Sequence, residues 1–189
     1  MAPRKAVPKE LTRETIMDAA RDLFIKKGYQ HVSMRQIAKK LNYSHGAIYY
    51  HFKNKAELFY ALVEKHFHML DETLDRIMAQ PLDSQEKLKQ VLLGFIEFGL
   101  THQSYYEMMF LTKDEEVIQF INHGPVNSFD KFATSVASLS DKEISLQEVW
   151  SLFLSLHGFV THNIRYVNSY EEVKEAALLH VNFLLKVIT

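Results

Sequence analysis

The sequence predicts an all-α protein in which an N-terminal three-helix domain containing a helix-turn-helix is joined by a long helix to a larger helical domain. Apolar residues recur at helical spacing along most of the 189 residues. Residues 33–52 contain two short helical patterns separated by a tight turn. No segment shows the sustained alternation or the hairpin dipeptides of β-strands. We therefore expect a helix-turn-helix domain over residues 1–55 and a second helical domain over residues 56–189.

The first expected helix begins after Thr12 and ends at Gly28. The Thr12 hydroxyl can cap its first turn, and Glu14 lies where the helix dipole favours an anion. Gly28 is the expected stop because glycine accepts the left-handed backbone that ends many helices. Residues 1–10 show no periodicity and are expected to form a flexible basic arm. One face of the helix is apolar: Ile16, Ala19, Ala20, Leu23 and Phe24.

The helix-turn-helix is predicted over Ser33 to Phe52. Ser33 and Gln36 have the spacing of a capping box, so a helix should begin there. Asn42 lies where the chain must turn and tolerates a left-handed backbone, and Ser44 can cap the second helix. The first helix has a single apolar face: Met34, Ile37, Ala38 and Leu41.

A long helix is expected from a cap at Asn54 to about residue 80, before Pro81. The break at 123–125 and the polar connection at 138–145 separate later elements. Further helices are predicted over residues 84–101, 105–111, 115–122, 126–138, 146–166 and 171–187.

Composition favours a cytoplasmic globular protein. Hydrophobic residues make up 47% and charged residues 24% of the chain, as in ordinary globular proteins. The chain has no cysteine, so disulfides, thiolate metal sites and cysteine nucleophiles are excluded. No apolar run reaches the length of a membrane-spanning helix, and the first residues lack the apolar stretch of a signal peptide. We expect no membrane association.

Charge divides the chain into two parts. Residues 1–55 contain 12 Lys or Arg and 4 Asp or Glu, a net charge of +8, whereas residues 56–189 contain 10 and 19, a net charge of −9. Such asymmetry is typical of a nucleic-acid-binding module attached to a non-binding one. Chance clustering of surface charge is the alternative, and its coincidence with the helix-turn-helix pattern argues against it.

The histidines do not form a predicted metal site. His66 and His68 are two residues apart and His157 and His162 are five apart, so neither pair has the i, i+4 spacing of a helical metal site. The sequence also lacks a G-x-S-x-G nucleophile motif and a glycine-rich phosphate loop. We therefore expect no enzyme activity, no metal and no cofactor.

The helix-turn-helix carries side chains suited to DNA. Arg35 can reach a guanine edge or a phosphate. Gly46 and Ala47 are small enough for the second helix to approach the bases closely, and His45 can donate to a base. Tyr49, Tyr50, His51 and Lys55 can bind phosphates. The alternative for each is a structural role, with one tyrosine in the core of the domain and His51 as a cap.

The first 60 or so residues resemble the DNA-binding domain of the TetR family of bacterial transcriptional regulators. The matching stretches are TRETIMDAARDLFIKKGY and SMRQIAKKLNYSHGAIYYHFKNKAEL. The resemblance implies a homodimer that binds a palindromic operator on double-stranded DNA, usually as a repressor, and releases it when a small molecule binds. Asn42, His45 and Ala47 depart from the residues common in the family, so the operator cannot be transferred from relatives. The residues implicated in DNA contact are Ser33, Arg35, Ser44, His45, Gly46, Ala47, Tyr49, Tyr50, His51 and Lys55.

The second domain contains an aromatic and methionine-rich set of residues that suits a pocket for a small, bulky apolar effector. Its net charge of −9 would also suit a cationic effector. The alternative is that these residues form an ordinary core. The candidate ligand-binding residues are Phe67, Phe95, Phe98, Tyr105, Met108, Met109, Phe129 and His157.

In the TetR family the last two long helices form the dimer interface, so the resemblance places a second set of residues there. Gly158 inside a helical pattern suggests close helix packing. Burial in the core of the monomer is the alternative for each of these residues. They are Trp150, Phe153, Leu154, Phe159, Val160, Leu178, Val181 and Leu185.

These observations together predict a ligand-responsive, homodimeric DNA-binding repressor. The alternative hypothesis is a sensor or interaction protein that retains the fold and does not bind DNA. A third hypothesis, an enzyme that uses the cavity of the second domain, is not supported by any catalytic group of residues in the sequence.

Overall fold

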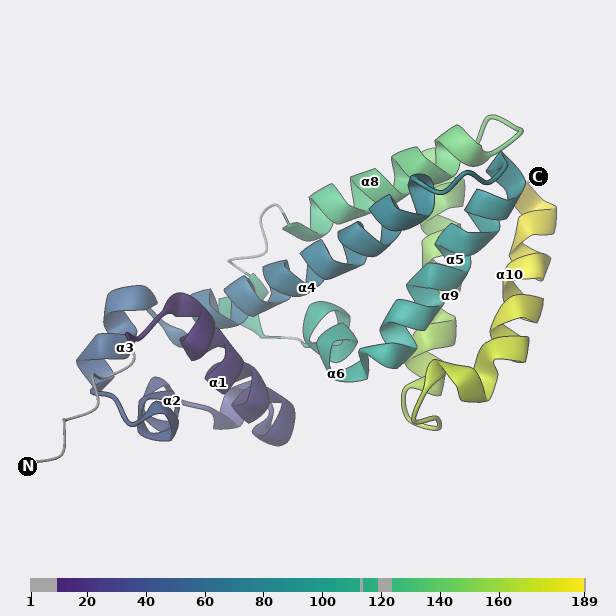
Figure 1. The fold of residues 1–189 in the computed structure, drawn as a ribbon. Coiled ribbons are helices and arrows are strands. Elements are labelled where there is room, and N and C mark those ends of the chain that lie inside the picture. The colour runs from purple at the N-terminus through teal and green to yellow at the C-terminus, as the bar shows by residue number, and fades with distance from the viewer. Residues whose placement is uncertain (1–9, 113, 119–123, 189) are drawn as a thin grey trace, which may run out of the picture. The chain divides into compact units, whose positions relative to one another are not determined.

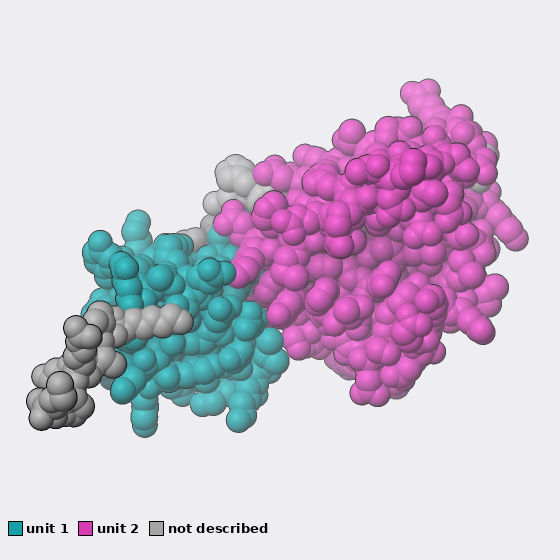
Figure 2. Space-filling model, viewed as in Figure 1, with its two compact units in different colours: residues 1–62, 113–120 teal, residues 63–112, 121–189 magenta. Residues whose placement is uncertain are grey.

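The computed structural model describes residues 10–112, 114–118 and 124–188, which form ten α-helices and no strands. The all-α prediction is confirmed. The chain divides into two compact units, coloured separately in Figure 2: Met1–Leu62 with Lys113–Phe120, and Val63–Thr112 with Ile121–Thr189. No helix in the described ranges is long and apolar enough to span a membrane.

The first unit is built on α1 (Arg13–Lys27), α2 (Met34–Leu41) and α3 (His45–His51), with a 3-10 turn, η1 (Tyr29–His31), after α1 (Figure 1). The α1 helix begins and ends as predicted. The Thr12 hydroxyl accepts a hydrogen bond from the Thr15 amide at 3.1 Å, and Gly28 ends the helix at a φ of 79°. The core of the unit is apolar: Ile16, Ala20, Phe24, Ile37, Ile48, Phe52, Leu58 and Phe59.

The long helix α4 (Lys55–Met78) contributes to both units. Asn54 Oδ1 accepts a hydrogen bond from the Glu57 amide at 2.7 Å, so the predicted cap is present. Leu58 and Leu62 are buried in the first unit, whereas Leu74 belongs to the core of the second. The first unit therefore extends seven residues past the expected boundary at 55, because the first two turns of α4 complete its core.

The second unit is arranged around α5 (Ser84–Thr101), whose residues pack against α8 (Gly124–Leu139), α9 (Leu146–Asn163) and α10 (Lys174–Ile188) (Figure 1). Two glycines of α5, Gly94 and Gly99, allow neighbouring helices to pack closely against it. A Cβ at Gly94 would lie 2.8 Å from Ile77 Cδ1, and one at Gly99 would lie 2.6 Å from Val160 Cγ1. Neighbouring helices can approach α5 closely at these two positions because no side chain separates them.

Three predicted elements differ in detail from those observed. The expected helix over 105–111 is a short α6 (Gln103–Tyr106) followed by a π-helical turn, η2 (Glu107–Leu111). Of the predicted break at 123–125, residue 123 lies outside the described residues, and Gly124 and Pro125 begin α8, where proline is tolerated because the first helical amides have no partner within the helix. The helix predicted over 171–187 is observed as a 3-10 turn, η3 (Tyr170–Val173), followed by α10. Of the predicted helix at 115–122, residues 119–122 lie outside the described residues.

The short helix α7 (Glu115–Ile118) belongs to the first unit although it lies between elements of the second in sequence. The Tyr29 hydroxyl donates to Glu116 Oε2 at 3.3 Å, and the Gln30 side-chain amide donates to Asp114. Burial and the nearby carboxylates raise the pKa of Tyr29, so its hydroxyl keeps its proton and remains a donor. These contacts attach residues 114–116 to η1.

Candidate DNA-binding surface and ligand cavity

Local hydrogen bonds fix the turn between α2 and α3. The Ser33 hydroxyl accepts from the Gln36 amide at 3.3 Å, and Gln36 Oε1 accepts from the Ser33 amide at 2.9 Å. Asn42 ends α2 in a left-handed conformation, with φ 62° and ψ 35°. The Ser44 hydroxyl accepts from the Ala47 amide at 3.2 Å and caps α3. The capping box, the left-handed turn and the second cap are all confirmed.

The outward face of α3 combines aromatic side chains with an open backbone patch. Ile48 is fully buried and anchors the helix, whereas Tyr49 and Tyr50 are 43% and 87% exposed. The His45 ring packs edge-on against Tyr49 at 4.6 Å between centroids. A Cβ at Gly46 would have no neighbour within 4 Å. This face carries the hydroxyl and imidazole groups of its exposed aromatic side chains, and Gly46 adds no side-chain bulk beside them. Such a face suits contact with the major groove of DNA.

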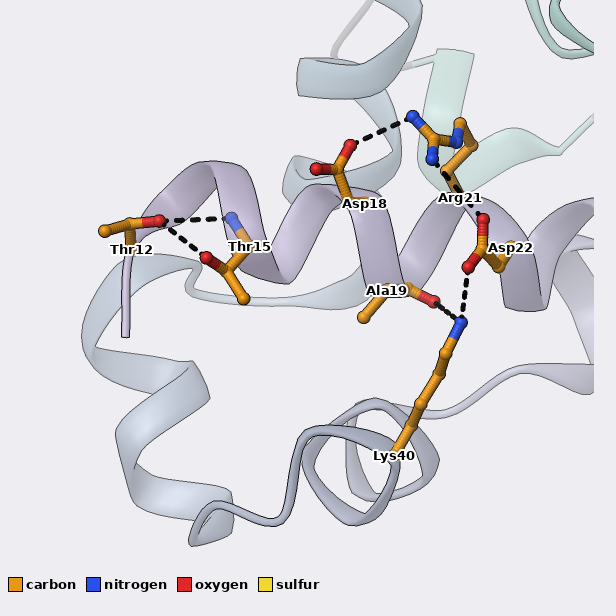
Figure 3. Close-up of polar contacts among 7 residues, drawn as sticks. All are labelled: Thr12, Thr15, Asp18, Ala19, Arg21, Asp22 and Lys40. Atoms are coloured by element: carbon orange, nitrogen blue, oxygen red, sulfur yellow. Dashed lines mark hydrogen bonds and ion pairs between the residues drawn. The ribbon is translucent and has the colours of Figure 1, made fainter. Parts of the chain in front are cut away.

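Two basic residues on α2 remain available to an anionic partner, whereas a third does not. Arg35 and Lys39 are exposed and make no ion pair with any described residue. Lys40 Nζ instead lies 2.7 Å from Asp22 Oδ2 and 3.2 Å from the Ala19 carbonyl oxygen, which ties α2 to α1 (Figure 3). The hydrogen bond from Lys40 holds the pKa of Asp22 below its usual value.

Arg13 and Lys55 also hold the first unit together. The Arg13 guanidinium lies 4.0 Å from the ring centroid of Phe52 and 3.8 Å from Glu57 Oε1. Lys55 Nζ donates to the Tyr29 carbonyl at 3.0 Å and lies 3.9 Å from the centroid of the Tyr29 ring. The Lys55 side chain, predicted to bind phosphate, is thus already engaged within the unit.

The second unit contains a partly open cavity of about 290 Å³, close to the lower end of the range for ligand pockets, roughly 300–1,000 Å³. Its walls come from α4, α5, η2, α8 and α9, and they are mainly aromatic and aliphatic. The lining residues are Phe67, Leu70, Asp71, Thr73, Leu74, Ile77, Val91, Gly94, Phe95, Met109, Phe110, Pro125, Ser128, Phe129, Phe132, Trp150 and Phe153.

One ionisable side chain lies in this lining, Asp71. The buried Ser128 hydroxyl donates to Asp71 Oδ2 at 3.0 Å. Burial raises the pKa of the Asp71 carboxyl, and the hydrogen bond from Ser128 and the charge of Lys131 partly oppose that rise. The cavity is therefore apolar except at one carboxylate with a fixed donor.

A second hollow of about 320 Å³ lies between α4 and α5. Its lining includes Arg76, Glu97 and His102, so groups of opposite charge face it. Arg76 donates hydrogen bonds to the Glu72 carbonyl and the Thr73 hydroxyl of its own helix. This mixed, polar lining does not favour one class of ligand.

Residues 16–62 match the profile described as bacterial regulatory proteins, tetR family. Over these residues the chain is a TetR-family DNA-binding domain.

The TetR-family relatives include SrpR of Pseudomonas putida, an HTH-type transcriptional regulator that is 37% identical over 71 residues, 38% of this chain and 33% of that protein. The chain aligns with half or less of the length of the first curated relatives it matches. The fold resembles that of the fatty acid degradation regulator FadR from Bacillus halodurans (TM-score 0.69, 19% identity, 95% of each chain). It also resembles SmeT in its complex with triclosan (TM-score 0.64, 19% identity, 93% of this chain and 90% of that one).

The TetR-family match covers most of α1, all of α2 and α3 and the start of α4, so the first unit is a helix-turn-helix DNA-binding domain. The TetR family consists of transcriptional regulators and not of enzymes. Among the residues the structure describes, no three His, Cys, Asp or Glu side chains are grouped to bind a metal ion.

The candidate DNA-contacting residues all lie in the TetR-family domain, on α2, α3, their caps and the start of α4. Both tyrosines of α3 are exposed, so neither fills the core of the domain. The exposed candidates are Ser33, Arg35, Ser44, His45, Gly46, Tyr49 and Tyr50, and the half-buried ones are Ala47, His51 and Lys55.

The candidate ligand-binding residues divide into two groups. Phe67, Phe95, Met109 and Phe129 line the cavity. The others lie elsewhere in the second unit: Phe98 lines the polar hollow, Tyr105 stacks on His66, Met108 is buried, and His157 bonds to Tyr106.

The candidate dimer residues of α9 and α10 also occupy different environments. Val160 and Val181 are fully buried in the core of the unit, so their side chains do not reach the surface of the protomer. Phe153 lines the cavity, and Phe159 stacks on His180. Phe159 and Leu185 are half-buried, and Trp150, Leu154 and Leu178 are exposed.

Sequence reasoning did not identify Asp71 as a cavity residue. Asp71 follows Phe67 by four residues and precedes Leu74 by three, so it interrupts the apolar face of α4. A carboxylate on an apolar helix face was the available signal. Its partner Ser128 is 57 residues away and had no local signal.

Proposed function

We propose that this protein is a homodimeric, ligand-responsive TetR-family repressor of transcription. The observation that carries the proposal is the α3 face, where exposed Tyr49, Tyr50 and His45 surround the open backbone at Gly46. The same chain holds an aromatic cavity in its second unit, which provides a place for an effector.

In this proposal α3 enters the major groove of DNA. The open position at Gly46 lets the helix backbone come close to the bases, and Ala47 places a methyl group beside it. Tyr49 and Tyr50 donate hydrogen bonds to phosphates, and Arg35 supplies a charge-assisted contact from α2. Two such domains in a dimer would bind half-sites about 34 Å apart on a palindromic operator.

Dimerisation is proposed to use the exposed apolar stripes of α9 and α10. On α9 the stripe repeats every four residues through Leu146, Trp150, Leu154 and Gly158. On α10 it consists of Leu179, Phe183 and Val187, which are 72%, 63% and 67% exposed. Apolar residues aligned in this way mark an interaction surface rather than scattered surface hydrophobics. Because Gly158 has no side chain, another helix could approach α9 closely there.

The effector is proposed to be a small, bulky apolar or cationic molecule that occupies the cavity and releases the operator. Aromatic rings from all five helical elements of its walls line the cavity, including Phe67, Phe95, Phe110 and Phe129, which favours an apolar body. The fold of SmeT is known in complex with triclosan, a precedent for a small molecule bound to this fold.

A gel-shift titration against the DNA upstream of the protein's own gene tests DNA recognition. We expect a specific complex that weakens steeply with salt, because Arg35 and Lys39 displace counterions. Arg35→Ala should weaken binding by about tenfold, or about 1.4 kcal/mol. Tyr49→Phe should weaken it by several-fold, because it removes one hydrogen bond. Lys174→Ala, an exposed basic residue of α10, is the matched control and should leave binding unchanged.

The opposite result would identify a different class of protein. If no specific, salt-sensitive complex forms, or if Arg35→Ala and Tyr49→Phe bind like the unaltered protein, the chain is a sensor or interaction protein that keeps the fold without recognising an operator.

A further inference from the structure

The charge of the cavity lining distinguishes between classes of effector. Asp71 is the only ionisable residue among the described residues that line the cavity. The remaining lining groups are aromatic rings, aliphatic side chains and the hydroxyls of Thr73 and Ser128. An occupant of this cavity therefore meets one negative charge and no positive one.

Neighbouring cations do not neutralise Asp71 by direct pairing. Lys131, three residues after Ser128 on α8, lies with Nζ 2.6 Å from Asp75 Oδ2 and is paired there. His68 is paired with Glu72 at 3.9 Å when it is protonated. No ion pair to Asp71 occurs within the described part of the chain, and its one direct side-chain partner is the neutral Ser128 hydroxyl. A carboxylate can accept several hydrogen bonds, so Asp71 retains acceptor capacity.

The rings around the cavity add to the same preference. The face of an aromatic ring carries partial negative charge and attracts cations, most strongly for tryptophan. Trp150 and Phe153 stack at 5.3 Å between centroids, and Phe129 packs edge-on against Trp150 at 5.0 Å. A carboxylate beside such rings disfavours an anionic occupant by like-charge repulsion and favours a cation.

We infer that the cavity binds lipophilic monocations, with a protonated amine hydrogen-bonded to Asp71 and an aromatic body packed against Phe95, Phe129 and Phe153. The inference rests on the proposed function in one respect, since it takes this cavity to be the effector site. A neutral lipophile or a fatty-acid-like anion is the competing occupant.

Trp150 provides a direct readout, because it lines the cavity and is the only tryptophan in the chain. The full-length protein is titrated at pH 7.5 with three probes of one skeleton: 3,3-diphenylpropylamine, 3,3-diphenylpropan-1-ol and 3,3-diphenylpropanoate. We expect saturable changes in tryptophan fluorescence. The amine should bind at least about tenfold more tightly than the alcohol, and the carboxylate should bind most weakly.

Two variants assign the preference to the proposed residue. Asp71→Asn keeps an oxygen acceptor for Ser128, so it should fold normally, lose the advantage of the amine and bind the alcohol as before. Glu72→Gln changes an exposed carboxylate of the same helix and should keep the advantage. A circular dichroism melt confirms that both variants are folded.

The inference is overturned if the amine gives no saturable change in fluorescence up to 1 mM, the concentration that corresponds to a binding free energy of about 4 kcal/mol. It is also overturned if the alcohol or carboxylate binds as tightly as the amine, or if Asp71→Asn retains the preference. Because this assay contains no DNA, it separates the two proposals. If the amine shows an Asp71-dependent preference but does not change DNA binding in the gel shift, the cavity binds cations and is not the effector site.

Discussion

The Tyr106 hydroxyl lies 2.7 Å from Nδ1 of His157, and this hydrogen bond joins α6 to α9 in the second unit. Tyr106 is fully buried, and burial raises its pKa, so the hydroxyl keeps its proton and can donate to the His157 tautomer whose Nδ1 is unprotonated. The His157 ring in turn packs against Phe110 and Phe153, both of which line the cavity. The pair therefore supports one wall of the cavity from behind.

The stability of the protein should depend on the protonation of His157. Burial lowers the pKa of His157 from its usual 6.5, so the unfolded chain binds this proton at a higher pH than the folded one. The contribution of His157 to stability is therefore complete above about pH 6.5 and is lost as the pH falls from there through the lowered pKa of the folded state. His157→Gln, which still accepts from Tyr106, should show a smaller loss of stability between pH 7 and pH 5.

Urea unfolding at pH 7.5, 6.5 and 5.5 measures this difference. His162→Gln, on the exposed side of the same helix, serves as the control and should follow the unaltered protein. A constant difference in stability between His157→Gln and the unaltered protein across the three pH values would contradict the prediction.

Gly99→Ala should destabilise the second unit by about 1–3 kcal/mol, the usual cost of overpacking a core. The new Cβ would lie 2.6 Å from Val160 Cγ1 and 3.0 Å from the Tyr106 ring, so neighbours that are themselves buried would have to move. The better helix propensity of alanine offsets only about 0.5–1 kcal/mol. Urea unfolding by circular dichroism reports the net effect, and a variant at least as stable as the unaltered protein would show that α5 is less tightly packed than the structure indicates.

Gly46→Ala should separate stability from DNA binding. A Cβ there has no neighbour within 4 Å, so the substitution should stabilise α3 by about 0.5–1 kcal/mol. The same methyl group would hold the helix away from the bases and weaken operator binding by about tenfold. Thermal unfolding and a gel shift test the two effects, and undiminished DNA affinity would argue that α3 does not approach the groove at this position.

Gly158→Leu should convert a dimer into monomers. The protomer itself leaves open space at this position, so its own fold should tolerate the larger side chain. In the proposed interface the leucine would prevent close approach of the partner helix. Sedimentation velocity measures the change in mass, with Glu72→Leu on an exposed position of α4 as the control. Retention of the dimer by Gly158→Leu would place the interface elsewhere.

Local signals in the sequence predicted the elements that local interactions determine. The caps at Thr12, Ser33 and Ser44 and the left-handed Asn42 each depend on residues within four positions of one another, and all are observed. The bounds of α5 agree as well, because Asp83 and a continuous apolar face define them.

Contacts between distant residues could not be predicted in the same way. The sequence gives no sign that Lys55 donates to Tyr29, 26 residues earlier, or that Tyr106 meets His157, 51 residues later. The π-helical turn at Glu107–Leu111 was also missed, since its apolar spacing resembles that of an α-helix over so few residues. The first two features are contacts between elements that only the folded chain brings together.

The attachment of residues 114–116 to η1 affects how this protein could be recombined with its relatives. A DNA-binding domain transplanted by cutting after Leu62 would leave behind Glu116 and Asp114, the partners of Tyr29 and Gln30. In the hybrid protein, Tyr29 and Gln30 would then contact the residues that the recipient protein has at the positions of Asp114 and Glu116. Specificity swaps in this fold should therefore exchange two separate stretches of sequence together, 1–62 and 113–120, so that Tyr29 keeps Glu116 as its hydrogen-bond partner.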